Sequence, residues 1–187
     1  EAERKQREKE ERKKFILSRY KIEKPLTLLN QKAFYQASEP FAEGDSFYFA
    51  REYFIQFDTK GEKNNINQQL EGLLQKYQSL AAPFMASLKS TGIQNSYFYL
   101  VYDYIDGVSL NKHLQNYKKT NKTGYPEGFV SFVCLKVCDI IEQLHCSLAE
   151  PVFIRNFSPN SLIFRKSDEQ FVFTNLFLEE AFSLLEN

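Results

Sequence analysis

The pattern of hydrophobic and polar residues shows first a highly charged segment at residues 1–14. Residues 1–14 are almost entirely charged, and their Glu–Lys and Glu–Arg pairs at i, i+4 spacing favour a solvent-exposed helix. The stretch has no apolar a and d positions, so it does not predict a coiled-coil seam. Pro25 is expected to end this helix, which makes residues 1–24 a charged helical arm or linker. Both a solvated linker and an arm lying on a partner fit the pattern.

A strand-rich region follows the charged stretch. A helix is predicted over residues 63–80, where apolar residues recur at helical spacing. Turns are expected at 42–46 and 91–95, where small and polar residues gather. Segments rich in aromatic and β-branched residues predict strands at 34–41, 47–58, 84–89 and 97–104.

The last part of the chain reads mainly as helix. Ser109 is a suitable N-cap for a short helix through Gln115, and the polar residues 117–128 predict a loop. A long apolar helix is expected over 129–147. Two short strands joined by a turn are predicted at 161–165 and 171–174. An amphipathic tail is predicted at 178–185.

The composition narrows the classes of function. Apolar residues make up 43% of the 187 positions, which is enough to bury a sizeable core. Lys plus Arg (24) equals Asp plus Glu (24), and this balance argues against direct nucleic-acid binding, which needs a basic face. No apolar run approaches the ~20 residues that span a bilayer, so no membrane association is expected.

The cysteines bear on compartment and on metal binding. Cys134, Cys138 and Cys146 form an odd set without paired spacing, which favours a reducing, cytoplasmic compartment over a disulfide framework. Zinc bound together with His145 is one alternative, but there is no CxxC pair. Buried thiols acting as small hydrophobes are the favoured interpretation, and no metal site is expected.

Three stretches in order resemble a protein kinase. Residues 97–110 resemble the fifth strand and hinge of the family, 154–164 are similar to the HRDLKxxN catalytic loop, and 171–177 stand where the DFG segment belongs. The resemblance implies an α+β, kinase-like fold. Its parts would be an antiparallel small-lobe sheet with one helix over 25–105 and the start of a helical large lobe over 106–187, preceded by the charged helix.

The hinge is the part of the kinase pattern that this sequence keeps. The resemblance makes Tyr102 the gatekeeper, with Asp103 to Ile105 as the hinge whose backbone would face adenine. Residual adenine contacts would therefore come from Asp103 and Ile105.

The positions that carry phosphoryl-transfer chemistry have been replaced. Transfer needs a lysine for the phosphates, carboxylate and amide ligands for Mg²⁺ and an aspartate as base. Residues 53–56 resemble the VAIK strand that carries this lysine, and Glu71 would be the lysine's partner on the following helix. No GxGxxG precedes Gln56. In this sequence Gln56 stands at the lysine position and Asn156 at the position of the base. In the catalytic loop, Ser158 stands for the lysine and Ser161 for the metal-binding asparagine. Asn175 stands for the aspartate of DFG.

These replacements imply a pseudokinase without enzymatic activity or cofactor. It would act as a scaffold, structural subunit or allosteric regulator through protein partners, within a larger assembly or a longer polypeptide, with cytoskeletal association as one version. The alternative is a nucleotide-binding kinase-like protein with residual or atypical phosphotransferase activity. An unrelated α+β domain also fits the element order. A hydrolase set of Ser158, Ser161, His145 and Asp139 lacks a GxSxG elbow.

Overall fold

The structure is a computed structural model whose described part forms two compact units. The first unit contains the described residues within 14–79, 87–104 and 181–185, and the second those within 82–86 and 105–180. Each unit has its own sheet. The described residues are 14–29, 32–42, 46–56, 60–79, 82–121, 124–146, 152, 154, 157–174 and 176–185.

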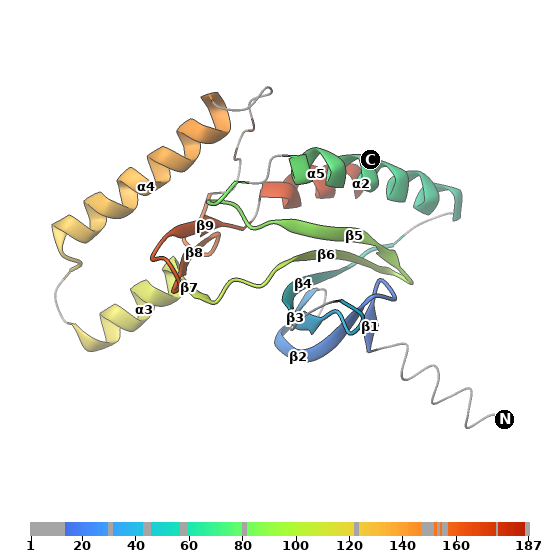
Figure 1. Ribbon diagram of the computed structural model, residues 1–187, viewed down its shortest axis with the longest axis horizontal. Coiled ribbons are helices and arrows are strands. Elements are labelled where there is room, and N and C mark those ends of the chain that lie inside the picture. Colours follow the sequence, from blue (N-terminus) through green and yellow to red (C-terminus); the bar gives the residue numbers. More distant parts are fainter. Residues whose placement is uncertain are drawn as a thin grey trace. The chain divides into compact units, whose positions relative to one another are not determined.

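The first unit is a six-stranded antiparallel sheet in the order β1-β2-β3-β4-β6-β5 (Figure 1). The helix α2 (Lys60–Ser79) connects β4 to β5 along the chain and packs on β5. The expected helix over 63–80 is thereby confirmed. The strands are β1 (Phe15–Ile16), β2 (Tyr20–Leu29), β3 (Lys32–Ser38), β4 (Phe47–Phe54), β5 (Leu88–Gln94) and β6 (Tyr97–Asp103).

Residues 15–24 form β1, a turn at 17–19 and the start of β2 rather than a helix, so this part of the predicted helical arm is wrong. Ile16 and Tyr20 are fully buried in a cluster with Ala37, Ala50 and Val101, and burial of these apolar side chains overrides the local charge pattern. Pro25 lies inside β2 between two register shifts. It is tolerated there because β1 pairs only with Tyr20 and Lys21, which leaves that edge of β2 without a partner strand in the described residues. Residues 1–13 lie outside the described residues.

The strand and turn bounds of the β5–β6 hairpin differ from those predicted. The strand expected at 84–89 starts instead at Leu88, and the turn expected at 91–95 narrows to Asn95 and Ser96. Asn95 has φ 57°, a left-handed conformation that asparagine adopts more readily than most residues. Ile93 is buried, and its backbone N–H donates to Asn67 Oδ1 on α2 at 3.1 Å, which keeps this segment in the sheet.

Two other expected strands are shorter than predicted. β3 ends at Ser38 and β4 ends at Phe54. Part of the turn between them (43–45) and the predicted strand end (57–58) lie outside the described residues.

The second unit has a three-stranded antiparallel sheet in the order β7-β8-β9. Its strands are β7 (Gly107–Ser109), β8 (Leu162–Arg165) and β9 (Phe171–Phe173), and its helices are α3 (Leu110–Thr120) and α4 (Glu127–Cys146). The expected β8–β9 hairpin and the long helix α4 are confirmed, and β7 was not predicted. A final helix, α5 (Leu176–Leu185), matches the expected amphipathic tail.

The helix α3 begins as predicted and ends later. The Ser109 side chain accepts from the Lys112 backbone N–H, as an N-cap does. Residues 117–120 are helical instead of loop. The Tyr117 ring stacks on Tyr125 with centroids 4.0 Å apart, and the Asn121 N–H donates to the Tyr117 carbonyl. This aromatic contact extends a polar sequence into helix.

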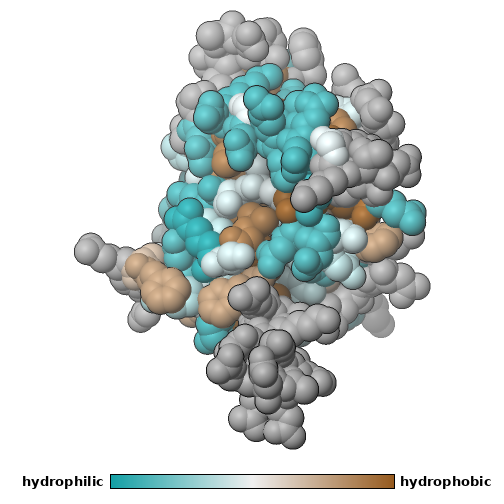
Figure 2. Space-filling model, turned by 90° about the vertical axis from the view of Figure 1, so that its right-hand side faces the viewer, coloured by the Kyte–Doolittle hydropathy of each residue, from teal (hydrophilic) through white to brown (hydrophobic). Residues whose placement is uncertain are grey.

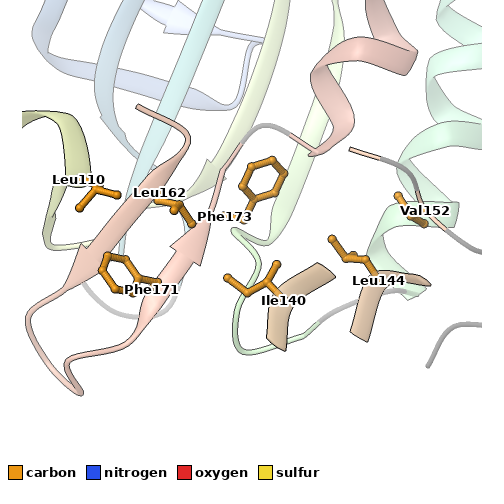
Figure 3. Close-up of a cluster of buried hydrophobic side chains, with 7 residues drawn as sticks. All are labelled: Leu110, Ile140, Leu144, Val152, Leu162, Phe171 and Phe173. Carbon is orange, nitrogen blue, oxygen red and sulfur yellow. The ribbon is translucent and has the colours of Figure 1, made fainter. Parts of the chain in front are cut away.

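The second unit's core joins its sheet to α3 and α4. Ile140 and Leu144 from α4 face Leu162, Phe171 and Phe173 from the hairpin, as Figure 3 shows. The side chains in this cluster are all at least nine-tenths buried. They are Leu110, Ile140, Leu144, Val152, Leu162, Phe171 and Phe173.

Length and hydropathy decide whether a helix can span a membrane. Within the described residues, every helix is too short or too polar to cross a bilayer. On the face shown in Figure 2, hydrophilic residues cover most of the coloured surface, and apolar residues show between them at several places.

Candidate functional site at the kinase-like positions

One face of the first unit's sheet gathers aromatic side chains from three strands. Cross-strand partners point to the same face of an antiparallel sheet, so the registers Phe34↔Arg51 and Phe49↔Tyr102 place these side chains together. Tyr53 follows Arg51 on the same side because strand side chains alternate. We call Phe34, Phe49, Arg51, Tyr53 and Tyr102 the aromatic face.

Arg51 lies at the centre of the aromatic face. It is only 8% exposed, and its guanidinium carbon lies 5.7, 5.3 and 5.6 Å from the ring centroids of Phe34, Phe49 and Tyr102. A cation held over aromatic rings away from water gains about 2 kcal/mol per good contact. The rings therefore replace part of the hydration that a buried guanidinium loses.

The aromatic face continues to α5. Phe182 lies edge-on to Tyr53, with centroids 4.9 Å apart, and also contacts Phe98 at 6.3 Å. Burial raises the pKa of Tyr53, while the neighbouring Arg51 opposes that rise. The face is thus filled with packed rings from β3, β4, β6 and α5.

Gln56, the predicted lysine position, does not belong to this face. It lies beyond the end of β4 and is exposed, and Glu71 is exposed on α2. Arg51 is the basic residue that β4 places on the buried side of the sheet, and the sequence interpretation missed it. The signal was present: an arginine stands alone in an aromatic strand, in phase with Phe49 and Tyr53.

The hinge residues occupy the end of β6 and the segment after it. Tyr102 is 3% exposed, burial raises its pKa, and its hydroxyl has no hydrogen-bond partner among the described residues. The Asp103 carboxylate pairs with Lys89 at 2.9 Å, and its backbone N–H donates to the Ser87 carbonyl at 3.0 Å. Ile105 is half-buried and belongs to the second unit.

The two serines of the predicted catalytic loop bind each other in the second unit. Their Oγ atoms are 3.0 Å apart, and the Ser161 N–H donates to the Ser158 carbonyl at 2.9 Å. Ser161 is fully buried, and Thr174 donates to its carbonyl through both N–H (2.9 Å) and Oγ1 (3.1 Å). These hydroxyls offer weak neutral ligands where Mg²⁺ would need hard anionic oxygens. Asn156 and Asn175 lie outside the described residues.

The cysteines are exposed, so the expectation that they are buried is wrong. Cys134 and Cys138 lie on α4 away from the stripe of Ile140 and Leu144 that enters the core, and Cys146 ends that helix. Among the described residues, no group of three or more His, Cys, Asp or Glu side chains could hold a metal ion.

The opposite face of the sheet carries a carboxylate bound by two phenols. Tyr35 and Tyr99 donate to the two Glu52 carboxylate oxygens, at 3.1 and 2.6 Å. Burial, followed by the charge of Glu52, raises the pKa of Tyr35 to about 12. Burial and the hydrogen bond to Glu52 raise the pKa of Tyr99 as well.

We expect the first unit to lose stability in alkali. Phenols in an unfolded chain ionise near pH 10, so above that pH the unfolded state binds fewer protons than the folded state, and the free energy of unfolding falls. The urea midpoint should therefore decrease between about pH 10 and pH 12. Tyr35→Phe should flatten the decrease, because it removes one group with a raised pKa. A midpoint that stays constant up to pH 11, or a slope unchanged by Tyr35→Phe, would contradict this account.

Comparisons with known proteins support the fold but leave the activity open. No protein-family model and no curated protein matches the sequence. Among solved structures, the kinase domain of PknI from Mycobacterium tuberculosis matches with a TM-score of 0.64 at 13% identity, covering 88% of this chain and 62% of that domain. A double mutant of the same domain gives a TM-score of 0.64 at 12% identity, covering 85% of this chain and 58% of that one. The chain spans less than two thirds of the kinase domains that it matches, and over that part its fold is protein kinase-like.

Proposed function

We propose that this chain is a non-catalytic, kinase-like module that acts through protein contacts, as a scaffold, structural subunit or allosteric regulator. The observation that carries the proposal is the aromatic face. In protein kinases the phosphate-binding lysine lies on the strand before the first helix, in a V-A-I-K pattern. Here β4 precedes α2, and its buried basic residue is Arg51, enclosed by rings.

The bulk of these rings argues against a nucleotide on this face. In the V-A-I-K pattern an alanine stands two residues before the lysine, whereas Phe49 stands two residues before Arg51. The chain between β2 and β3 contains no glycine, so a Gly-rich loop over phosphates is missing from the sequence there. A guanidinium already held by Phe34, Phe49 and Tyr102 would have to leave those rings to reach a phosphate.

The catalytic-loop positions support the same conclusion. Asn156 cannot accept a proton near neutral pH, which removes general-base help of typically 10²–10⁴-fold. Asn175 offers an amide where the metal-binding carboxylate belongs. The hydrogen bond between Ser158 and Ser161 keeps both hydroxyls engaged inside the second unit.

Exposed apolar residues favour protein partners. Val130, Phe132 and Leu135 are 48%, 38% and 65% exposed on α4, where a helix of an isolated domain is normally polar. The thiols of Cys134 and Cys138 are exposed on the same helix and without disulfides, which fits a reducing compartment such as the cytoplasm.

A thermal-shift titration with ATP tests the proposal. A ligand stabilises the folded state by RT ln(1 + [L]/Kd), so ATP at about 1 mM would add about 1.4 kcal/mol if Kd were about 0.1 mM. We expect no rise in melting temperature with ATP alone or with ATP and Mg²⁺. The rival hypothesis, a nucleotide-binding protein with residual phosphotransferase activity, predicts a rise that depends on Mg²⁺. That rise would overturn the non-catalytic assignment.

The variant Phe49→Ala provides a matched control for the titration. It removes the ring two residues before Arg51 while leaving the hinge and the catalytic loop unchanged. A shift that appears with ATP only in this variant would support steric filling of the face as the reason for the lack of binding.

A further inference from the structure

The segment that contains α3 carries charges of one sign and is followed directly by Glu127, which starts α4. Residues 107–126 include four lysines and one histidine but no aspartate or glutamate, in a chain whose net charge is zero. Asp106, just before this region, is engaged with Lys166 at 2.7 Å. Within the described part of the chain, none of Lys112, Lys118 and Lys119 forms an ion pair.

The positive charge of Lys112 is unfavourable at its position in the first turn of α3. The N-terminal end of a helix carries partial positive charge, so acidic residues stabilise the first turn and a lysine there is unfavourable. With Ser109 as N-cap, Lys112 occupies the third helical position, where Glu is the favoured residue in the S-x-x-E pattern. Lys118 and Lys119 lie in the last turn and are explained by the helix dipole alone, whereas Lys112 is not.

Lys112 and Lys119 lie on the same exposed side of α3. Lys112 and Lys119 are seven residues apart, which places them on the same side of the helix about 10 Å from each other. Gln115 and Asn116 lie between them, and all four side chains are exposed. Leu114 and Tyr117, on the other side, are half-buried.

We propose that this lysine face of α3 (Lys112, Gln115, Asn116 and Lys119) binds an acidic polypeptide segment. The lysines would pair with carboxylates, and the two amides would hydrogen-bond the peptide backbone. Residues that break a local rule of stability are typical of functional surfaces, and Lys112 is such a residue. The inference extends the proposed function by naming the class of partner.

The neighbouring aromatic residues favour a peptide over a nucleic acid. Single-stranded nucleic acids bind by stacking bases on available rings. Tyr125 stacks between Tyr117 and Phe129, at 4.0 and 5.0 Å, and its hydroxyl donates to the His113 carbonyl. These rings are engaged with one another and offer few free faces to a base.

Fluorescence anisotropy with a labelled Glu-Ser repeat peptide of about 12 residues tests the proposal, since that length extends well past the distance between the lysines. The full chain should bind this peptide at low salt, and raising the salt should weaken binding. The double variant Lys112→Glu with Lys119→Glu should lose at least about tenfold in affinity. Lys24→Glu, an exposed lysine on β2, makes a matched single charge reversal and should leave binding unchanged.

The single variant Lys112→Glu separates binding from folding. It should lower peptide affinity while its melting temperature stays equal or rises, because Glu suits the first turn better than Lys. A lower melting temperature, no binding by the unaltered chain, or an equal loss in Lys24→Glu would overturn the proposal. Tighter binding of an oligouridylate of equal charge, lost in Lys112→Glu, would overturn it in favour of nucleic acid. A shift with ATP would instead contradict only the proposed function.

Discussion

Replacing Arg51 with alanine should lower the free energy of unfolding of the first unit by about 3 kcal/mol. The substitution removes a buried side chain that contacts Phe34, Phe49 and Tyr102, and it leaves a cavity among rings that cannot easily collapse. It also removes the cation–π attraction, which is strongest where water is excluded. Urea unfolding followed by tyrosine fluorescence, at neutral pH, measures the change.

Two further variants at this position separate packing from charge. Arg51→Met keeps much of the volume of the stem without the charge, so it should cost less than the alanine variant. Arg51→Lys keeps the charge but loses the planar group that lies over the rings, so a loss of about 1 kcal/mol is expected. If Arg51→Ala unfolds at the same urea concentration as the unaltered chain, Arg51 does not hold the aromatic face together.

The contacts of Arg51 also bear on the proposed non-catalytic function. Arg51 on β4 is a cation whose guanidinium packs against the rings of Phe34, Phe49 and Tyr102. In the second unit, Ser158 and Ser161 likewise satisfy each other. Arg51 in the first unit and the Ser158–Ser161 pair in the second thus make their contacts within the chain, which is what the proposed non-catalytic function expects.

The sequence predicted best those elements whose local signals agree with their packing. Ser109 is both an N-cap by type and a cap in the structure, and the α4 stripe of Ile140 and Leu144 is both periodic and buried. It failed where tertiary contacts outweigh local preference. The helix predicted from the charge spacing of residues 1–14 extends to Lys24, but Ile16 and Tyr20 enter the core as strand residues.

The candidate site could be predicted only in part, because a sequence motif does not specify which residues of neighbouring strands pair with one another. The motif comparison placed the lysine position at Gln56 by likeness to V-A-I-K alone. The pairing of Arg51 with both Phe34 and Leu100 depends on strands that are distant in sequence. Alternation along β4 could have shown that Arg51 shares a side with Phe49, but the partners across the sheet could not be inferred from it.

Gly107→Ala should destabilise the second unit by about 3 kcal/mol or prevent its folding. Gly107 opens β7 and pairs with Arg165 on β8. A Cβ atom at this position would lie 2.4 Å from the Phe164 carbonyl oxygen and 2.5 Å from Ile163 Cγ2. The first neighbour is backbone, so relief requires β7 and β8 to separate, which breaks the edge of the three-stranded sheet next to the Ser109 cap of α3.

The matched control is Gly128→Ala in the first turn of α4, where an added Cβ meets nothing within 4 Å. Because alanine restricts the unfolded chain and suits a helix, this variant should gain about 0.5 kcal/mol. Urea unfolding of the two variants beside the unaltered chain gives midpoints that should move in opposite directions. Equal midpoints for Gly107→Ala and the unaltered chain would mean that β7 does not approach β8 as closely as described. In that case the Ser109 cap alone, and not the pairing of β7 with β8, would fix where α3 begins.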